Sequence, residues 1–207
     1  MSSKKGVLVV VSGFSGAGKG TLMKALLEKY DNYALSVSAT TRTPREGEED
    51  GREYFFKTRE QFEEMIRGDQ LIEYAQYVGN YYGTPREYVM GNMEAGRDVI
   101  LEIEIQGALK IKKKFPGAVL IFVMPPSAGE LKKRLIGRGT EAMSVINARL
   151  KRAVEESVGI ENYDYVLIND QVDACAERMH CLIQAQHSRA SENLEFIEEI
   201  RREMENL

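Results

Sequence analysis

The sequence has no tryptophan and only two cysteines and two histidines among its 207 residues. Cys175 and Cys181 lie in a stretch of helical character at a spacing that points them to different faces, so a local disulfide is not expected. Free thiols are typical of a reducing compartment, which predicts a cytoplasmic protein. His180 and His187 have no cysteine or carboxylate at metal-ligand spacing, which favours surface or packing roles.

Long apolar runs and an excess of positive charge are also missing. The longest apolar run, residues 118–124, is far shorter than the ~20 residues of a membrane helix, and the first residues lack the pattern of a secretory signal. The net charge is −4, whereas nucleic-acid binding depends on excess positive charge. We therefore expect neither a membrane nor a nucleic acid as partner.

Apolar periodicity indicates alternating strands and helices. Continuous apolar, β-branched runs predict buried strands, and apolar residues at helical spacing predict helices between them. The predicted strands are residues 7–11, 99–105, 119–123 and 165–168, and the predicted helices are residues 19–30, 86–95, 107–114 and 130–135. This order implies an α/β fold with a parallel sheet flanked by helices.

Two stretches interrupt this alternation. Residues 36–88 are polar and turn-rich, and their length suggests a small inserted domain rather than a loop. Residues 127–157 are helical and basic, and Gly137 and Gly139 would allow a hinge there. The expected division is a core of residues 1–36, 88–126 and 158–207, an inserted mixed α/β domain of residues 37–87, and a helical lid of residues 127–157.

A glycine-rich segment between the first strand and the first helix matches the phosphate-binding pattern G-x-x-x-x-G-K, the P-loop. Its backbone N–H groups can point at phosphate oxygens, and its lysine can reach the β- and γ-phosphates. We expect a three-layer fold of the P-loop NTPase type that binds ATP through Gly13, Phe14, Ser15, Gly16, Ala17, Gly18, Lys19, Gly20 and Thr21.

The P-loop departs from the usual pattern at one position. The hydroxyl residue expected directly after the lysine, as a Mg²⁺ ligand, is replaced by Gly20, and Thr21 follows one position later. This ending resembles the P-loop of adenylate kinases. Mg²⁺ would then be held mostly by ATP oxygens, water and an acidic residue elsewhere.

The second substrate must be inferred from other residues. Arg42 and Arg45 stand among hydroxyl residues, and guanidinium forks match phosphate geometry. Glu73 follows them, and an ionised carboxylate accepts hydrogen bonds from N1–H and N2–H₂ of guanine but would repel the acceptor N1 of adenine. These residue types indicate a guanine nucleotide.

The ordered set of motifs resembles the guanylate kinase family. After the P-loop come S-x-S-x-T-T-R-x-x-R at residues 36–45, G-x-x-Y-x-F at 51–56, L-I-E at 71–73, G-N-Y-Y-G at 79–83 and L-K-K-R-L-x-G-R-G-T at 131–140. The resemblance runs from about residue 7 to residue 170, most of the chain. It implies transfer of the γ-phosphoryl group of ATP to GMP, with Mg²⁺ as cofactor.

The resemblance also implies roles for individual residues. The GMP site would consist of Arg42, Arg45, Tyr54 and Tyr82 around the phosphate and of Ser38, Glu73 and Thr84 at the base, and it would also include Gly83. Asn169 resembles the adenine-side loop of the family. The lid arginines would be Arg134, Arg138 and Arg149, which with Lys19 would stabilise the charge of the transferred phosphoryl group.

Acidic and apolar residues alternate over residues 101–105. Period two puts Glu102 and Glu104 on one face of the strand predicted there. Buried carboxylates are costly, and ligands bind at the carboxyl ends of such strands. We assign Glu102 to Mg²⁺ through water and Glu104 to the guanine; alternatively, only one of them is functional and the other is solvated or salt-bridged.

Two other functions stay open at this point. A guanylate-kinase-like module that only binds partner peptides would have lost its P-loop and acceptor residues, which are intact here apart from the hydroxyl missing at Gly20. A kinase for another nucleoside monophosphate is suggested by the Gly20-Thr21 ending, although Ser38 and Glu73 argue against adenine.

The charged C-terminal tail carries apolar residues at helical spacing: Leu194, Ile197, Ile200, Met204 and Leu207. We expect this helix to pack on the core of its own chain. The alternative is a contact between subunits of a homo-oligomer.

Overall fold

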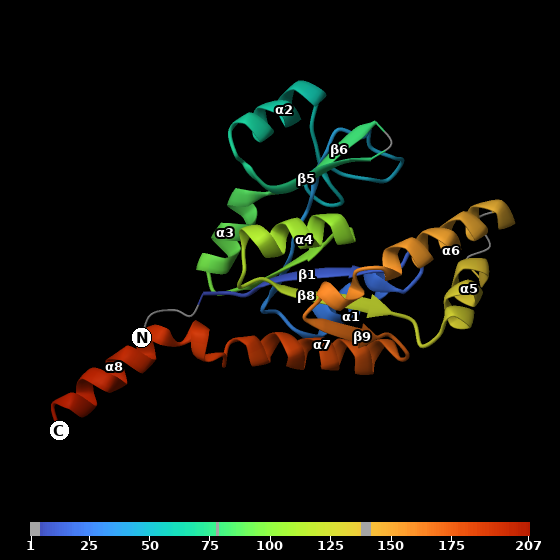
Figure 1. Cartoon of the computed structure of the whole chain (residues 1–207). Coiled ribbons are helices and arrows are strands. Elements are labelled where there is room, and N and C mark those ends of the chain that lie inside the picture. The colour runs from blue at the N-terminus through green and yellow to red at the C-terminus, as the bar shows by residue number, and fades with distance from the viewer. Residues whose placement is uncertain (1–4, 78, 138–141) are drawn as a thin grey trace.

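The computed structural model describes residues 5–77, 79–137 and 142–207. Its centre is a five-stranded parallel sheet with the order β2-β7-β1-β8-β9 (Figure 1). The strands are β1 (Leu8–Gly13), β2 (Tyr33–Leu35), β7 (Asp98–Glu102), β8 (Val119–Met124) and β9 (Tyr165–Ile168). The central strands β1 and β8 are almost wholly buried, which explains their continuous apolar sequence.

Helices cover both faces of this sheet. α1 (Lys19–Lys29) and α7 (Val172–Gln186) pack together on one face, and α3 (Arg86–Glu94) and α4 (Ile105–Lys114) lie on the other (Figure 1). Leu22, Met23 and Leu26 turn the apolar side of α1 into the core. The predicted three-layer α/β fold is therefore confirmed.

The prediction for residues 99–105 is wrong at its C-terminal end. β7 stops at Glu102, and Glu104 directly precedes α4 in an extended conformation. Residues 105–114 form a helix instead, because Gly107, Ala108 and Ile111 form a buried helical face against the sheet. Glu102 and Glu104 consequently do not share a strand face.

A second sheet is built from the segment between β2 and α3. Its order is β4-β3-β6-β5, with β3 (Ala39–Thr40), β4 (Phe55–Phe56), β5 (Leu71–Tyr77) and β6 (Asn80–Pro85). α2 (Arg59–Arg67) covers it, and a capping box at Thr58 and Gln61 starts this helix. Phe62 of α2 is fully buried with Ala39 and Leu71, so this sheet has a small core of its own. It stands beyond α3 and α4, at the top of Figure 1.

Three helices extend from the body at the edges of the core. α5 (Ala128–Gly137) and α6 (Met143–Ser157) follow β8, and two short 3-10 turns, Ile160–Asn162 and Ala190–Glu192, follow α6 and α7. α8 (Leu194–Glu205) projects away from the body (Figure 1) and has no buried residue. The expectation that α8 packs on its own core is wrong, because Leu194, Phe196 and Met204 are all more than half exposed at 59%, 62% and 66%.

The two cysteines form no disulfide, and the two histidines make packing and hydrogen-bonding contacts. Cys175 is buried and Cys181 is exposed, and both thiols are free, as predicted. His180 stacks on Tyr30, and His187 contacts the buried Asp98 through Nε2 at 2.8 Å. None of the helices in the described ranges is long and apolar enough to cross a membrane.

Candidate active site

The P-loop connects β1 to α1 and requires glycine at two positions. Gly16 and Gly18 have φ angles of 91° and 90°, which side chains other than glycine rarely adopt. A Cβ at Gly18 would also lie 2.7 Å from Nδ2 of Asn169. Phe14 and Ala17 have buried side chains, so these two residues can offer a phosphate only their backbone groups.

Lys19 is the first residue of α1 and bends back over the loop. Its Nζ donates to the Gly13 carbonyl at 2.8 Å and to the Phe14 carbonyl at 3.4 Å. Glu102 is the last residue of β7 and its side chain is exposed to solvent. Partial desolvation by the neighbouring protein raises the pKa of its carboxyl, and the charge of Lys19 opposes the rise. The charges of Lys19 and Glu102 therefore act on each other beside the P-loop, where the phosphates of a nucleotide would lie.

Arg134 and Asn169 both donate hydrogen bonds to the backbone of the P-loop. Arg134 donates to the carbonyls of Ala17 at 3.3 Å and Asn169 at 2.9 Å, and its Nε donates to Glu130 at 2.9 Å. Asn169 is buried, and its Nδ2 donates to the Ala17 carbonyl at 2.9 Å. In this structure both side chains therefore donate to the loop backbone, and their assignment to the nucleotide stays a prediction.

The helix α6 brings further basic side chains over the P-loop. Arg149 donates from Nη1 to Oγ of Ser15 at 3.0 Å, which joins α6 directly to the loop. Arg152 contacts Glu104 at 2.6 Å and Glu156 at 2.8 Å. Glu104, assigned to the guanine from the sequence, is thus salt-bridged to α6. Arg138 lies outside the described residues.

Three of the residues assigned to GMP, Glu73, Gly83 and Thr84, lie on β5 and β6 of the second sheet. Thr84 donates to the Glu73 carboxylate at 2.8 Å. Burial raises the pKa of Glu73, and the bond from Thr84 and the charge of Lys110 partly offset this. Gly83 is required by packing, because a Cβ there would come within 2.9 Å of the Glu73 carbonyl. Ser38 directly precedes β3.

The two sites are joined through α4. A Cβ placed on Gly107, in the first turn of α4, would lie 3.4 Å from Oε2 of Glu73. The same connection leaves β7 at Glu102, which interacts with Lys19. A short segment of chain therefore has the P-loop at one end and the base-site carboxylate at the other.

The residues assigned to the acceptor phosphate gather around Arg42. Its guanidinium lies 5.2 Å from the Tyr54 ring centroid, and the Tyr54 and Tyr82 rings are 6.0 Å apart. Arg45 is exposed at the start of the following turn. The guanidinium of Arg42 is also paired with Glu48, which the sequence reasoning missed. The available signal was a carboxylate three residues after a predicted phosphate-binding arginine.

Few side chains near the P-loop could act as metal ligands. Gly20 provides no side chain, and Thr21 is exposed. Across residues 5–77, 79–137 and 142–207, no group of three or more His, Cys, Asp or Glu residues could hold a metal ion. Glu102 beside Lys19 is the carboxylate that fits a site shared with nucleotide phosphates.

The fold and the P-loop together define a P-loop kinase with a second, smaller sheet and with a helix, α6, in contact with the P-loop. Residues 5–186 match the family model described as guanylate kinase, and the chain belongs to the guanylate kinase family. It is 51% identical to a guanylate kinase of Halalkalibacterium halodurans, over 94% of this chain and 96% of the relative. It is 54% identical to one of Streptococcus pneumoniae, over 88% of both chains.

A solved structure supports the same assignment. The crystal structure of guanylate kinase from Anaplasma phagocytophilum matches with a TM-score of 0.75 and 34% sequence identity, and the match covers 95% of each chain. The confirmed family membership accounts for the ordered motifs, and nothing in these comparisons favours a peptide-binding module or a kinase for another base.

Proposed function

We propose that this protein is an enzyme that transfers the γ-phosphoryl group of ATP to GMP, giving ADP and GDP. The observation that carries the proposal is the connection from β7 to α4. Lys19 of the P-loop interacts with Glu102 at the start of this connection, and Glu73 of the second sheet lies close to Gly107 at its end. Two nucleotides bound at these ends would direct their phosphates toward each other between the P-loop and Arg42. Such positioning is the main requirement of phosphoryl transfer.

The mechanism needs no nucleophilic side chain. An oxygen of the GMP phosphate attacks the γ-phosphorus, the bond to the β–γ bridging oxygen breaks, and ADP leaves. Lys19 exchanges the loop carbonyls that it contacts in this structure for phosphate oxygens, and Arg149 adds positive charge from α6. Closure of the lid excludes water, which would otherwise hydrolyse ATP.

Mg²⁺ is proposed as the cofactor, held by ATP oxygens and through water by Glu102. Oxygen ligands, few protein carboxylates and retained water are typical of magnesium bound with nucleotide phosphates. Bound in this way, the ion would neutralise the negative charge that develops on the phosphates.

We further propose that residues 37–87 form the GMP-binding domain, that residues 127–157 form a lid that closes on the core of residues 1–36, 88–126 and 158–207, and that the protein works in the cytoplasm.

The acceptor is tested by offering GMP, AMP, UMP and TMP in turn with ATP in a coupled assay of ADP release. Turnover of GMP far ahead of the others supports the proposal. Faster turnover of AMP would contradict the guanine assignment, and no turnover of any of them would favour a protein-binding module.

Replacement of Glu73 by glutamine is expected to weaken GMP binding about tenfold or more, because a charged acceptor of guanine N–H groups becomes a mixed amide. Binding of ATP should not change. Calorimetric titration of each nucleotide measures both, with Glu64→Gln, an exposed change on α2 of the same sheet, as control. Equal losses for GMP and ATP would contradict the place of Glu73 at the base.

Self-association through α8 is a further proposal, because the helix carries an apolar face and has no buried residue. A chain that ends at Ala190 is expected to lose subunits from any oligomer while keeping GMP kinase activity. Light scattering after gel filtration gives the mass of each form. An unchanged number of subunits would exclude α8 as the contact.

A further inference from the structure

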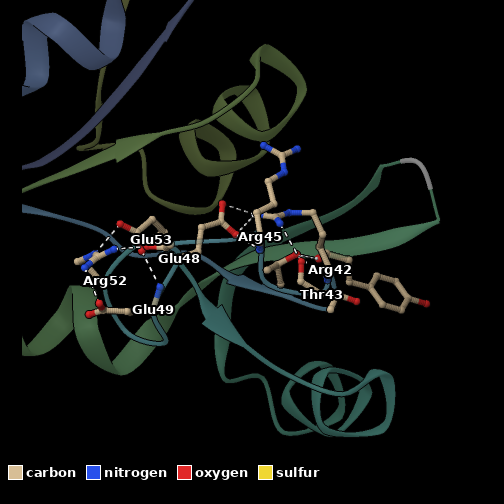
Figure 2. A network of polar contacts seen from close by, with 10 residues as sticks. Arg42, Thr43, Arg45, Glu48, Glu49, Arg52 and Glu53 are labelled. Atoms are coloured by element: carbon tan, nitrogen blue, oxygen red, sulfur yellow. Dashed lines mark hydrogen bonds and ion pairs between the residues drawn. The ribbon is translucent and has the colours of Figure 1, made fainter.

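The acceptor-phosphate residues include an acidic partner that the reaction itself does not require. Both Glu48 carboxylate oxygens lie 2.9 Å from Nη2 of Arg42, and Oε2 also accepts the backbone N–H of Arg45 at 2.8 Å. Figure 2 shows this arrangement, in which the Glu48 carboxylate is turned toward Arg42 and the Arg45 backbone. One carboxylate therefore fixes the side chain of one arginine and the backbone of the other.

This pair differs from an ordinary surface salt bridge. The side chains of Arg42 and Glu48 are only 15% and 16% exposed. In the next turn, Arg52 and Glu49 also pair at 2.9 Å, but they are 53% and 71% exposed. Exposed pairs contribute little, whereas a shielded charge must be paired, and removal of its partner is strongly unfavourable.

The remaining contacts of Arg42 hold it in the same place. Its Nη1 donates to the Thr43 carbonyl at 2.8 Å, and its backbone N–H donates to Oγ1 of the buried Thr40 at 3.1 Å. Its guanidinium lies 5.2 Å from the Tyr54 ring and 5.8 Å from the Phe56 ring. A guanidinium carries five N–H donors, so it can keep these contacts and still donate to a phosphate oxygen.

The turn that carries Glu48 is closed by local bonds. The Glu48 N–H donates to the Arg45 carbonyl at 3.1 Å, and Arg52 donates to the Gly47 carbonyl at 2.5 Å. The hydrogen bond from the Arg45 backbone, and after it the hydrogen bond and charge of Arg42, keep the pKa of Glu48 below its ordinary value, although desolvation opposes this. Glu48 is therefore anionic at neutral pH and its position does not depend on a bound ligand.

We propose that Glu48 is a positioning residue for the acceptor phosphate, which sets the distance and orientation between Arg42 and Arg45 before GMP binds. The inference rests on the proposed function, because it assumes that these two arginines receive the GMP phosphate. Glu48 does not contact substrate in this role. Because Glu48 already orders the Arg42 side chain, GMP binding loses less conformational entropy, which is the energetic advantage of a preformed site.

The test compares Glu48→Gln with Glu46→Gln, a matched loss of one negative charge at an exposed position of the same turn. For Glu48→Gln we expect the KM for GMP to rise about tenfold, because the amide nitrogen faces a guanidinium and one charged acceptor is lost. The kcat at saturating GMP and the KM for ATP should stay within about twofold of wild type. Glu46→Gln should match wild type in all three constants.

Two further measurements separate positioning from general stability. Glu48→Gln should unfold at a lower midpoint than Glu46→Gln, because it removes the charged partner of the shielded Arg42, so the kinetic constants are measured at a temperature where both variants are fully folded. Glu48→Asp, which keeps the charge on a shorter side chain, should recover part of the affinity for GMP. An unchanged KM for GMP in Glu48→Gln would overturn the inference. A lower KM would also overturn it, because Glu48 would then be a competitor for the phosphate position.

Wild-type turnover of GMP, measured in the same assay, distinguishes this inference from the proposed function. No turnover by the wild type would overturn both. Normal wild-type turnover together with an unaffected Glu48→Gln would overturn the role of Glu48 alone.

Discussion

Replacement of Lys19 by alanine is expected to lower kcat for ATP-dependent phosphorylation of GMP by about 10³-fold, the magnitude reached when a preorganised donor to developing charge is removed. The Lys19 ammonium donates to the Gly13 carbonyl at 2.8 Å, beside the loop proposed to bind the phosphates. Without it, the charge of the β- and γ-phosphates is stabilised by backbone N–H groups alone. Steady-state assays at saturating GMP measure the loss.

The affinity for GMP should remain close to wild type, because Lys19 lies at the P-loop and Glu73 and Arg42 belong to the other sheet. Lys24→Ala is the matched control, since Lys24 is an exposed residue of the same helix that contacts Glu28 at 3.8 Å. The control should keep full activity. A normal kcat in Lys19→Ala would refute the catalytic role of the P-loop.

The core of the fold could be predicted because its signals are local. β1 and β8 are buried on both faces, so their sequences are continuous apolar runs, and the P-loop glycines between β1 and α1 have backbone angles that few other residues adopt. Apolar runs and glycine positions can be recognised without knowing the tertiary contacts of the rest of the chain.

The end of β7 could not be predicted in this way. The alternation of Leu101, Ile103 and Ile105 suggests a strand, but Ile105 also begins a helix whose buried residues include Ala108 and Ile111. Both periodicities fit over a few residues, and the helix forms because its apolar face packs on the sheet. This tertiary contact moved Glu104 out of the strand and next to Arg152 of α6.

Tertiary contacts also limit what the sequence can predict about the candidate GMP site and the P-loop. The sequence singles out Arg42, Arg45, Tyr54 and Tyr82 by motif, and the structure brings Arg42, Tyr54 and Tyr82 together, with Arg45 beginning the next turn. For Glu48 the sequence offers only its spacing from Arg45, which does not reveal the pairing with Arg42, because that pairing depends on how a turn folds back toward the end of β3. The sequence also does not reveal that Arg134 donates hydrogen bonds to the Ala17 and Asn169 carbonyls, because these bonds join α5 to residues far away along the chain.

Replacement of Arg149 by alanine is the second change for which we expect a large effect, with kcat lowered about 10³-fold and the KM values changed much less. Arg149 already reaches Ser15 of the P-loop at 3.0 Å from α6, so it is positioned to donate to the transferred phosphoryl group. That group carries its charge on three outer oxygens in the transition state, and a guanidinium fork matches this geometry.

Arg149→Lys keeps the charge but not the fork, so it should recover only part of the lost rate. Lys151→Ala, an exposed change on the same helix, should leave kcat unaltered and serves as the control. Rapid-quench measurement of a single turnover separates the chemical step from product release, and the defect should appear in the chemical step. A loss confined to the KM for ATP would show that Arg149 binds the nucleotide equally in the ground state and the transition state, and would exclude it as a transition-state arginine.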